Sequence, residues 1–239
     1  MKILSLDTSA TVASIAISSN STPLAQYTLN AKNTHSETLL PMIESALNAL
    51  SLKPSDIDIF ALSAGPGSFT GVRIGAATVK GLAFASNKPC VEVSTLEALA
   101  QNLVLREGLI CSVMNARRSQ VYTALFQSNG KELQRIMPDS ALSIEELDSI
   151  LSQYNEPIAL VGDGYEICEQ GFSKTELVFV PEAMRLQSAL SVAAIALKNY
   201  NNGNACTDSA LSVNYLRPSQ AERERAEREE ANKNKSKKD

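Results

Sequence analysis

Tryptophan is absent from this chain, and the three aromatic residue types together make up only 5% of it. Proteins that hold single-stranded nucleic acid stack its bases on aromatic side chains, and nucleic-acid-binding domains are commonly basic, with a pI above about 9. This chain has a net charge of −4 and a pI of about 5.2. The composition argues against a free-standing nucleic-acid binder and leaves open contact with RNA through a partner.

Histidine occurs once, at position 35. A metal site built from several histidines therefore cannot form, and a serine–histidine–aspartate triad would have to use His35 itself. The G-x-S-x-G motif of α/β-hydrolases is also missing. We expect no catalytic site, no bound metal and no cofactor.

The four cysteines, at positions 90, 111, 168 and 206, form no C-x-x-C pair, which argues against a structural zinc site or a thioredoxin motif. Cys90 and Cys111 lie in apolar runs and are expected to be buried, reduced thiols. No apolar stretch approaches the roughly 20 residues that cross a bilayer. We expect a soluble, cytoplasmic protein.

The apolar runs that are present predict a duplicated α/β fold. Strand-like runs at 3–7, 11–18 and 24–29 are joined by short turns and predict an antiparallel meander. The segment "ILSLDTSATVASIAI" aligns with "CSVMNARRSQVYTALF" at an offset of 108, so that Asp7 corresponds to Asn115. Actin-like and sugar-kinase-like ATPases are built from two such halves.

We divide the chain accordingly into an N-terminal lobe (1–106), a C-terminal lobe (107–218) and a charged tail (219–239). The tail holds seven Lys or Arg and six Asp or Glu residues, and no apolar residue larger than alanine. Because it cannot bury an apolar face, we expect it to be solvated or disordered.

Three capping boxes predict helix starts, since a Ser or Thr is followed three residues later by Glu. They lie at Thr34, Ser94 and Ser143. The first begins a helix in which Pro41 is expected to introduce a bend.

The stretch "GPGSFTGVRIG" (65–75) follows an apolar run and precedes a helix, as phosphate-binding loops do. It lacks the GK[ST] ending of a P-loop, and its glycines miss the G-x-G-x-x-G spacing of dinucleotide sites. A type II turn fits better, with Pro66 fixing φ and Gly67 accepting a positive φ. Ser68 or Thr70 would then cap the helix.

The helix that follows has two apolar faces. Projected at 100° per residue, Gly71, Gly75, Val79 and Leu82 share one face. Ile74 and the small residues Ala77, Gly81 and Ala85 share the other. One face would pack on the sheet of this chain and the other on a partner; the alternative is a helix enclosed within the monomer. We predict a partner interface at the following residues: Gly71, Val72, Arg73, Gly75, Ala76, Val79 and Leu82.

The first hairpin carries "DTSA", in which Asp7, Thr8 and Ser9 are candidates for a degenerate nucleotide site. The turn lacks the glycine that admits phosphate closely, and Asn115 cannot supply a second carboxylate. The alternative is that Asp7 only forms the turn. On the matching hairpin, "NARR" (115–118) offers two arginines to a phosphate, to a partner carboxylate or to solvent.

Several motifs together resemble the TsaB (YeaZ) family over residues 1–218. They are "ILSLDTSATVASIAI", "HSETLLPMI", "AGPGSFTGVRIGAATVKGLAFA", "VSTLEALA", "NARRSQVY" and "NYLRP". The chain departs from the family pattern at Asn115, where "DARR" is expected, and this departure argues further against a cation site at that turn.

The resemblance implies an actin-like fold of the ASKHA, ribonuclease H-like type with two lobes. It also implies a cytoplasmic, non-catalytic role in tRNA modification beside the transferase TsaD and the ATPase TsaE. TsaD moves a threonylcarbamoyl group from its adenylate to adenosine 37 of tRNA; the older label glycoprotease reflects shared ancestry. A homodimer through a related helical surface is a further implied state. The alternative function is a stand-alone ATP-binding phosphotransferase or ATPase of the ASKHA type, with Asp7 holding Mg²⁺.

Overall fold

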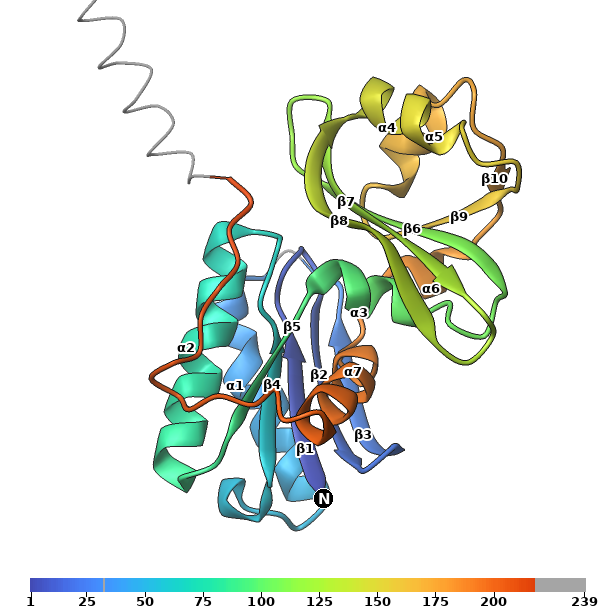
Figure 1. Cartoon of the computed structure of the whole chain (residues 1–239). Helices are drawn as coiled ribbons and strands as arrows, with labels where there is room; N and C mark the ends of the chain where they lie inside the picture. Colours follow the sequence, from blue (N-terminus) through green and yellow to red (C-terminus); the bar gives the residue numbers. More distant parts are fainter. Residues whose placement is uncertain (32, 218–239) are drawn as a thin grey trace, which may run out of the picture.

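A computed structural model describes residues 1–31 and 33–217, which form two five-stranded sheets flanked by helices (Figure 1). The first sheet has the order β3-β2-β1-β4-β5, and the second has the order β10-β9-β6-β7-β8. The strands of the first sheet are β1 (Lys2–Asp7), β2 (Ala13–Ser19), β3 (Thr22–Leu29), β4 (Ile59–Ser63) and β5 (Cys90–Val93). Those of the second are β6 (Gly108–Asn115), β7 (Gln120–Ser128), β8 (Leu133–Ser143), β9 (Ile158–Val161) and β10 (Leu177–Val178).

Both sheets have the same topology. In each, the first three strands form an antiparallel meander, and the fourth and fifth strands add in parallel on the other side of the first. Asp7 ends β1 and Asn115 ends β6, as the internal alignment predicts. The duplicated α/β actin-like fold is therefore confirmed.

Helices cover both faces of the first sheet. They are α1 (His35–Ala49), the short 3₁₀ helix η1 (Pro54–Asp56), α2 (Phe69–Ser86) and α7 (Ala189–Asn201). Helices α1 and α2 bury one face of the sheet, while α7 packs on the opposite face against β1, β2 and β5. Because β1 and β4 are covered on both sides, they are buried almost throughout, including their polar residues Ser5, Asp7 and Ser63.

The remaining helices belong mainly to the second sheet. They are α3 (Thr95–Gln101), α4 (Ile144–Leu151), α5 (Tyr165–Gly171) and α6 (Glu182–Arg185). Helix α3 packs on β6 and β7, although it precedes residue 107, and α7 packs on the first sheet, although it follows that residue. The division of the chain between residues 106 and 107 stays a prediction. A division by packing would assign α3 to the second lobe and α7 to the first.

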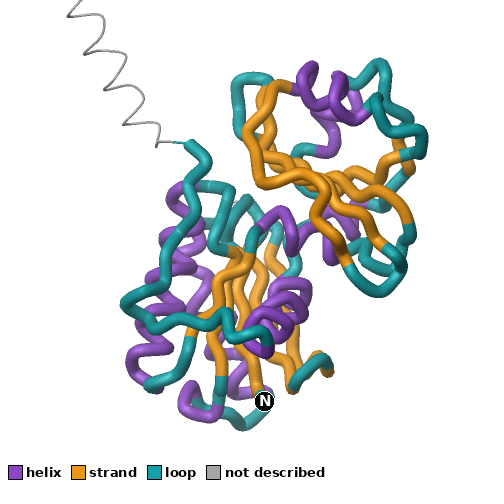
Figure 2. The backbone as a smooth tube through the Cα atoms, in the orientation of Figure 1, coloured by secondary structure: helices purple, strands orange, loops and turns teal. Residues whose placement is uncertain are grey.

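After α7 the chain crosses the first lobe without regular secondary structure (Figure 2). We call residues 206–217 the C-terminal strap. It begins beside β5, where Cys206 pairs with Cys90, and reaches the start of α2, where the Tyr215 ring packs at a tilt against Phe69. The predicted charged tail, 219–239, lies outside the described residues.

The predicted capping boxes differ in outcome. Ser143 and Glu146 form a complete box at α4, as predicted. Ser94 accepts the N–H of residue 97 at the start of α3, but the Glu97 side chain pairs with Arg135 instead. Thr34 is the N-cap residue of α1, as predicted, but its side chain makes no capping hydrogen bond, so the predicted box was wrong at this helix.

Candidate functional site

The glycine-rich loop starts α2 by a hydrogen bond from the Gly71 N–H to the Ser68 hydroxyl, 3.3 Å long. The predicted cap at Ser68 is therefore confirmed, but the predicted type II turn is wrong. The positive φ of 113° belongs to Gly65, and Gly67 is not among the positive-φ residues. A Cβ at Gly65 would lie 2.3 Å from the carbonyl oxygen of Asn214, so the strap passes directly against this glycine.

Further along α2, two glycines admit the turn between β1 and β2. A Cβ at Gly71 would lie 2.1 Å from the carbonyl oxygen of Thr8, and one at Gly75 would lie 2.5 Å from its hydroxyl. The Thr8 hydroxyl donates to the Gly71 carbonyl at 2.8 Å. We call the side of α2 that carries Gly71 and Gly75 its thin face. Thr8 of the same chain packs against this face.

This packing corrects the predicted interface. Gly71, Val72, Gly75, Ala76 and Val79 are all buried within the monomer, so they offer no docking surface. The alternative, a face enclosed within the monomer, holds for these five residues. The two other predicted interface residues remain accessible, because Arg73 is exposed and Leu82 is half-buried. A helical projection identifies a thin face but cannot tell which neighbour fills it.

The opposite face of α2 is the accessible one. Ala77 and Gly81 are exposed there, and a Cβ at Gly81 would meet nothing within 4 Å. Phe84 is 76% exposed, and Leu40 of the adjacent α1 is 56% exposed. A groove of about 360 Å³ is lined by α1 between Leu40 and Asn48, by residues 52–54 and by Leu82 of α2. We call the accessible sides of these two helices the outer α1–α2 face.

The side chain of Asp7 is enclosed and fully engaged. Its Oδ1 accepts the Ser9 N–H at 2.9 Å and the Ser9 hydroxyl at 2.6 Å, and its Oδ2 accepts the Ser63 hydroxyl at 2.5 Å. Burial raises the pKa of Asp7, and these hydrogen bonds oppose the shift. Its geometry is that of a residue that holds the β1–β2 turn, beside the contact of His35 Nε2 with the Ala10 carbonyl at 2.7 Å.

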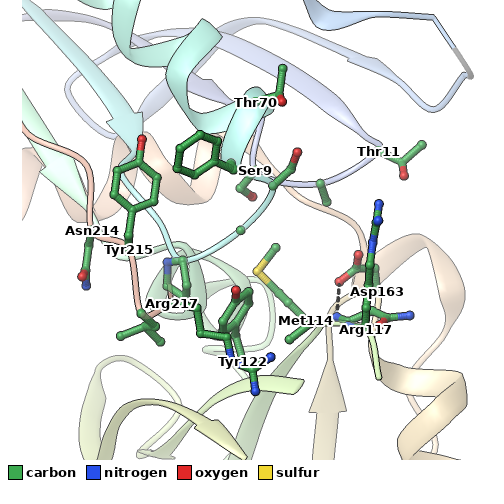
Figure 3. Close-up of a pocket in the computed structure, with 18 residues that line it drawn as sticks. Ser9, Thr11, Thr70, Met114, Arg117, Tyr122, Asp163, Asn214, Tyr215 and Arg217 are labelled. Carbon is green, nitrogen blue, oxygen red and sulfur yellow. Dashed lines mark hydrogen bonds between the residues drawn. The ribbon is translucent and has the colours of Figure 1, made fainter. Parts of the chain in front are cut away.

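A cleft of about 680 Å³ lies between the two lobes (Figure 3). Ser9 lines it from the first lobe, where Thr8 is buried behind it. Asn115, Arg117 and Asp163 line it from the second lobe. The three nucleotide-site candidates therefore lie at the cleft wall, with one of them facing the cavity.

Asn115 organises the second hairpin. Its Oδ1 accepts the Arg117 N–H at 2.8 Å, and its own N–H donates to Asp163 Oδ1 at 3.3 Å. Residues 117–119 all have positive φ, between 53° and 62°, which is unusual for residues other than glycine. The predicted turn position of both arginines, Arg117 and Arg118, is confirmed.

Asp163 brings a carboxylate to this turn although position 115 has none. The surrounding protein raises the pKa of Asp163 to about 6, and the nearby Asp7 adds to the shift. A hydrogen bond from the Asn115 N–H opposes it. Within residues 1–31 and 33–217, however, no group of three or more histidine, cysteine or acidic side chains is placed to hold a metal ion.

The strap contributes cleft residues that the sequence did not single out. Tyr215 lies 4.9 Å from the Phe69 ring, and the Arg73 guanidinium lies 3.7 Å above Phe69. Arg73 Nε also donates to the Tyr215 hydroxyl at 2.7 Å, and Arg217 bonds to Gln120 of β7. In the sequence, only the motif "NYLRP" indicated this segment. The contacts of the strap could not be predicted, because they join residues that are far apart in the chain.

Comparison with known proteins places this geometry in context. The model of the TsaD family, tRNA N6-adenosine threonylcarbamoyltransferase, matches residues 24–224. The Bacillus subtilis "tRNA threonylcarbamoyladenosine biosynthesis protein TsaB" is 35% identical over 170 residues, which cover 71% of this chain and 74% of that protein. The Escherichia coli protein of the same description is 28% identical over 225 residues, which cover 91% and 95%.

A solved structure gives the same result. A Pseudomonas aeruginosa protein described as similar to the peptidase YeaZ superposes with a TM-score of 0.80 and 26% identity. The match covers 90% of this chain and 99% of that one. In the part of the chain that the structure describes, no helix has the length and apolar character needed to cross a membrane.

Proposed function

The chain belongs to the TsaB (YeaZ) family, within the wider TsaD family, and from that premise we propose that it is a non-catalytic scaffold and activator of TsaD. Its role lies in tRNA threonylcarbamoyladenosine biosynthesis. In this proposal it acts in the cytoplasm with TsaD and TsaE. TsaD transfers the threonylcarbamoyl group to adenosine 37, and tRNA meets this chain only through the complex.

The observation that carries the proposal is the outer α1–α2 face. Phe84 and Leu40 are large apolar side chains that stay 76% and 56% exposed on neighbouring helices. Aromatic side chains are enriched among the residues that anchor interfaces. Ala77 and Gly81 are small and exposed on the same helix. A helix pair of the partner could therefore approach α2 closely and cover both side chains.

The non-catalytic assignment draws on the state of Asp7. A carboxylate that holds Mg²⁺ needs free lone pairs directed at the ion. Both oxygens of Asp7 already accept hydrogen bonds from Ser9 or Ser63, and the side chain is 1% exposed. In this proposal, Asp7 has a structural role: it fixes the β1–β2 turn against which α2 packs.

The homodimer and the TsaD complex compete in this proposal for one surface. A second copy of the chain would present the same apolar outer α1–α2 face, so two copies could bury Phe84 against each other. TsaD would then displace the second copy. When TsaD is added, the species that contains the chain should change from two copies of the chain to one copy bound to one TsaD, and its measured mass should match that complex.

The test is binding of TsaD from the same organism to a folded variant. Phe84→Glu places a charge at the centre of the outer α1–α2 face, and we expect the Kd to rise at least about 30-fold, since anchor residues contribute about 2 kcal/mol or more. The matched control is Phe179→Glu, because Phe179 is 75% exposed in the second lobe. Equal affinity of Phe84→Glu and wild type would overturn the proposed docking face.

The stand-alone ATPase remains the alternative, and the cleft between the lobes is the observation in its favour. Titration calorimetry with Mg-ATP separates the two functions. Micromolar binding with turnover that Asp7→Asn abolishes would support the ATPase. Absence of turnover, together with TsaD activation by the same preparation, would support the scaffold.

A further inference from the structure

Two cysteines that are far apart in sequence meet at the edge of the first sheet. Cys90 begins β5, and Cys206 begins the C-terminal strap. The Cys90 N–H donates to the Cys206 carbonyl at 2.8 Å, and the Cys206 N–H donates to the Cys90 carbonyl at 2.9 Å. The two residues are therefore directly opposed in an antiparallel bridge and exchange both backbone hydrogen bonds.

The Cα separation expected for this pairing is that of a disulfide. Opposed residues that exchange both hydrogen bonds have Cα atoms about 5.5 Å apart, and disulfides most often join Cα atoms about 5.5–6 Å apart. Opposed residues also direct their side chains to the same face of the ladder. Accordingly, both side chains pack on the same apolar cluster beneath α1 and α2.

We propose that Cys90 and Cys206 are a modification site, at which a peroxide oxidant forms a reversible disulfide that fastens the C-terminal strap to β5. Both thiols are free in the structure. Cys206 is half-buried while Cys90 is fully buried, so the oxidant meets Cys206 first.

The chemistry balances in two steps. The Cys206 sulfur attacks one oxygen of hydrogen peroxide, the O–O bond breaks, and the products are a sulfenic acid and one water. The Cys90 thiol then attacks the sulfenic sulfur, the S–S bond forms, and the hydroxyl leaves with the thiol proton as a second water. Reduction by a dithiol restores both thiols.

The surroundings make this a slow reaction. Burial, followed by the neighbouring Cys206 and Asp208, raises the pKa of the Cys90 thiol to about 12. Burial and the nearby Glu92 also raise the pKa of Cys206. Because the thiolate is the nucleophile, both residues stay reduced until the oxidant is abundant.

A Cys90–Cys206 disulfide would affect the cleft between the lobes, because the strap connects Cys206 to the cleft wall. The strap is held to the first lobe by the Ser212 N–H on Glu92 and by the Asn214 N–H on the Ala64 carbonyl, the latter 2.7 Å long. Its far end supplies Tyr215 to the cleft wall. A disulfide at residue 206 fixes the near end and thereby restricts opening of the segment.

Peptide mapping tests the pairing, because trypsin separates the four cysteines into four peptides. These span residues 81–106, 107–117, 136–174 and 199–223. After treatment of the folded chain with hydrogen peroxide, we expect peptides 81–106 and 199–223 to be linked, with a mass lower by two hydrogen atoms. Dithiothreitol should separate them. Oxidation of Cys206 to its sulfinic acid with Cys90 unmodified would overturn the pairing.

Matched variants separate this site from the other two cysteines. Cys111→Ala with Cys168→Ala should leave the link intact, whereas Cys206→Ser should abolish it. Loss of the link in the first variant, with its fold intact by circular dichroism, would contradict the assignment.

Hydrogen exchange tests the consequence for the strap. The Ser212 and Asn214 amides should exchange at least severalfold more slowly in oxidised wild type than in reduced wild type, and equally fast in both states of Cys206→Ser. Unchanged exchange in a chain that carries the disulfide would refute the fastening of the strap.

Discussion

Replacement of Gly71 by alanine tests whether the thin face of α2 is filled by the same chain. The added Cβ would lie 2.1 Å from the backbone carbonyl oxygen of Thr8 and 3.3 Å from His35 Cδ2. The carbonyl cannot retreat freely, because the hydrogen bonds of Asp7 hold the turn on which it lies. Helix α2 would have to move away from β1.

The magnitude follows from three contributions. Overpacking of a rigid site costs about 1–3 kcal/mol, and loss of the hydrogen bond from Thr8 to Gly71 costs about 1 kcal/mol more. The gain from alanine over glycine in a helix is at most about 1 kcal/mol and smaller in the first turn, where Gly71 lies. We expect a net loss of about 2–3 kcal/mol, or about 5–10 °C in Tm for a chain of this size.

Gly81→Ala is the matched control, because it makes the same change in the same helix. A Cβ at Gly81 meets nothing within 4 Å, so only the helix propensity changes and stability should rise by about 0.5–1 kcal/mol. Urea denaturation followed by circular dichroism measures both variants. If Gly71→Ala were as stable as Gly81→Ala, the packing of α2 on the β1–β2 turn would be wrong.

Three further predictions concern single side chains. Ser68→Ala should cost about 1 kcal/mol in urea denaturation, because it removes the cap of α2, while Thr70→Ala should cost less than half of that. Burial raises the pKa of Asp148, but hydrogen bonds from residues 173–175 outweigh it and leave the pKa below its ordinary value. Its carboxylate therefore stabilises the fold above pH about 4, and the stability advantage of wild type over Asp148→Asn should disappear as the pH falls below that value. Asp163 should titrate near pH 6 by carbon NMR, and a value near 4 would contradict the raised pKa.

The duplicated fold could be predicted because its signals are local. Short apolar runs mark most of the strands, and the offset of 108 between the halves appears directly in the sequence. The exchange of α3 and α7 between the sheets could not be predicted, because an apolar helix face does not specify which sheet it covers.

The site was predicted less completely, because its contacts join distant segments. The two faces of α2 are visible in the sequence, but Thr8 lies 63 residues before Gly71, and only the folded chain brings them together. Tyr215 meets Arg73 across 142 residues. The sequence therefore indicated a two-faced helix, but it could not show that the face with Gly71 and Gly75 packs within the chain.

A reconstituted modification assay tests the central claim, that this chain activates TsaD through the outer α1–α2 face. The assay measures threonylcarbamoyl transfer to tRNA by TsaD and TsaE with wild type, Phe84→Glu or Phe179→Glu. We predict that modification requires the chain, that Phe84→Glu lowers the rate at least about 10-fold at subsaturating concentration, and that Phe179→Glu retains the wild-type rate. Full modification with Phe84→Glu, or without the chain, would contradict the account.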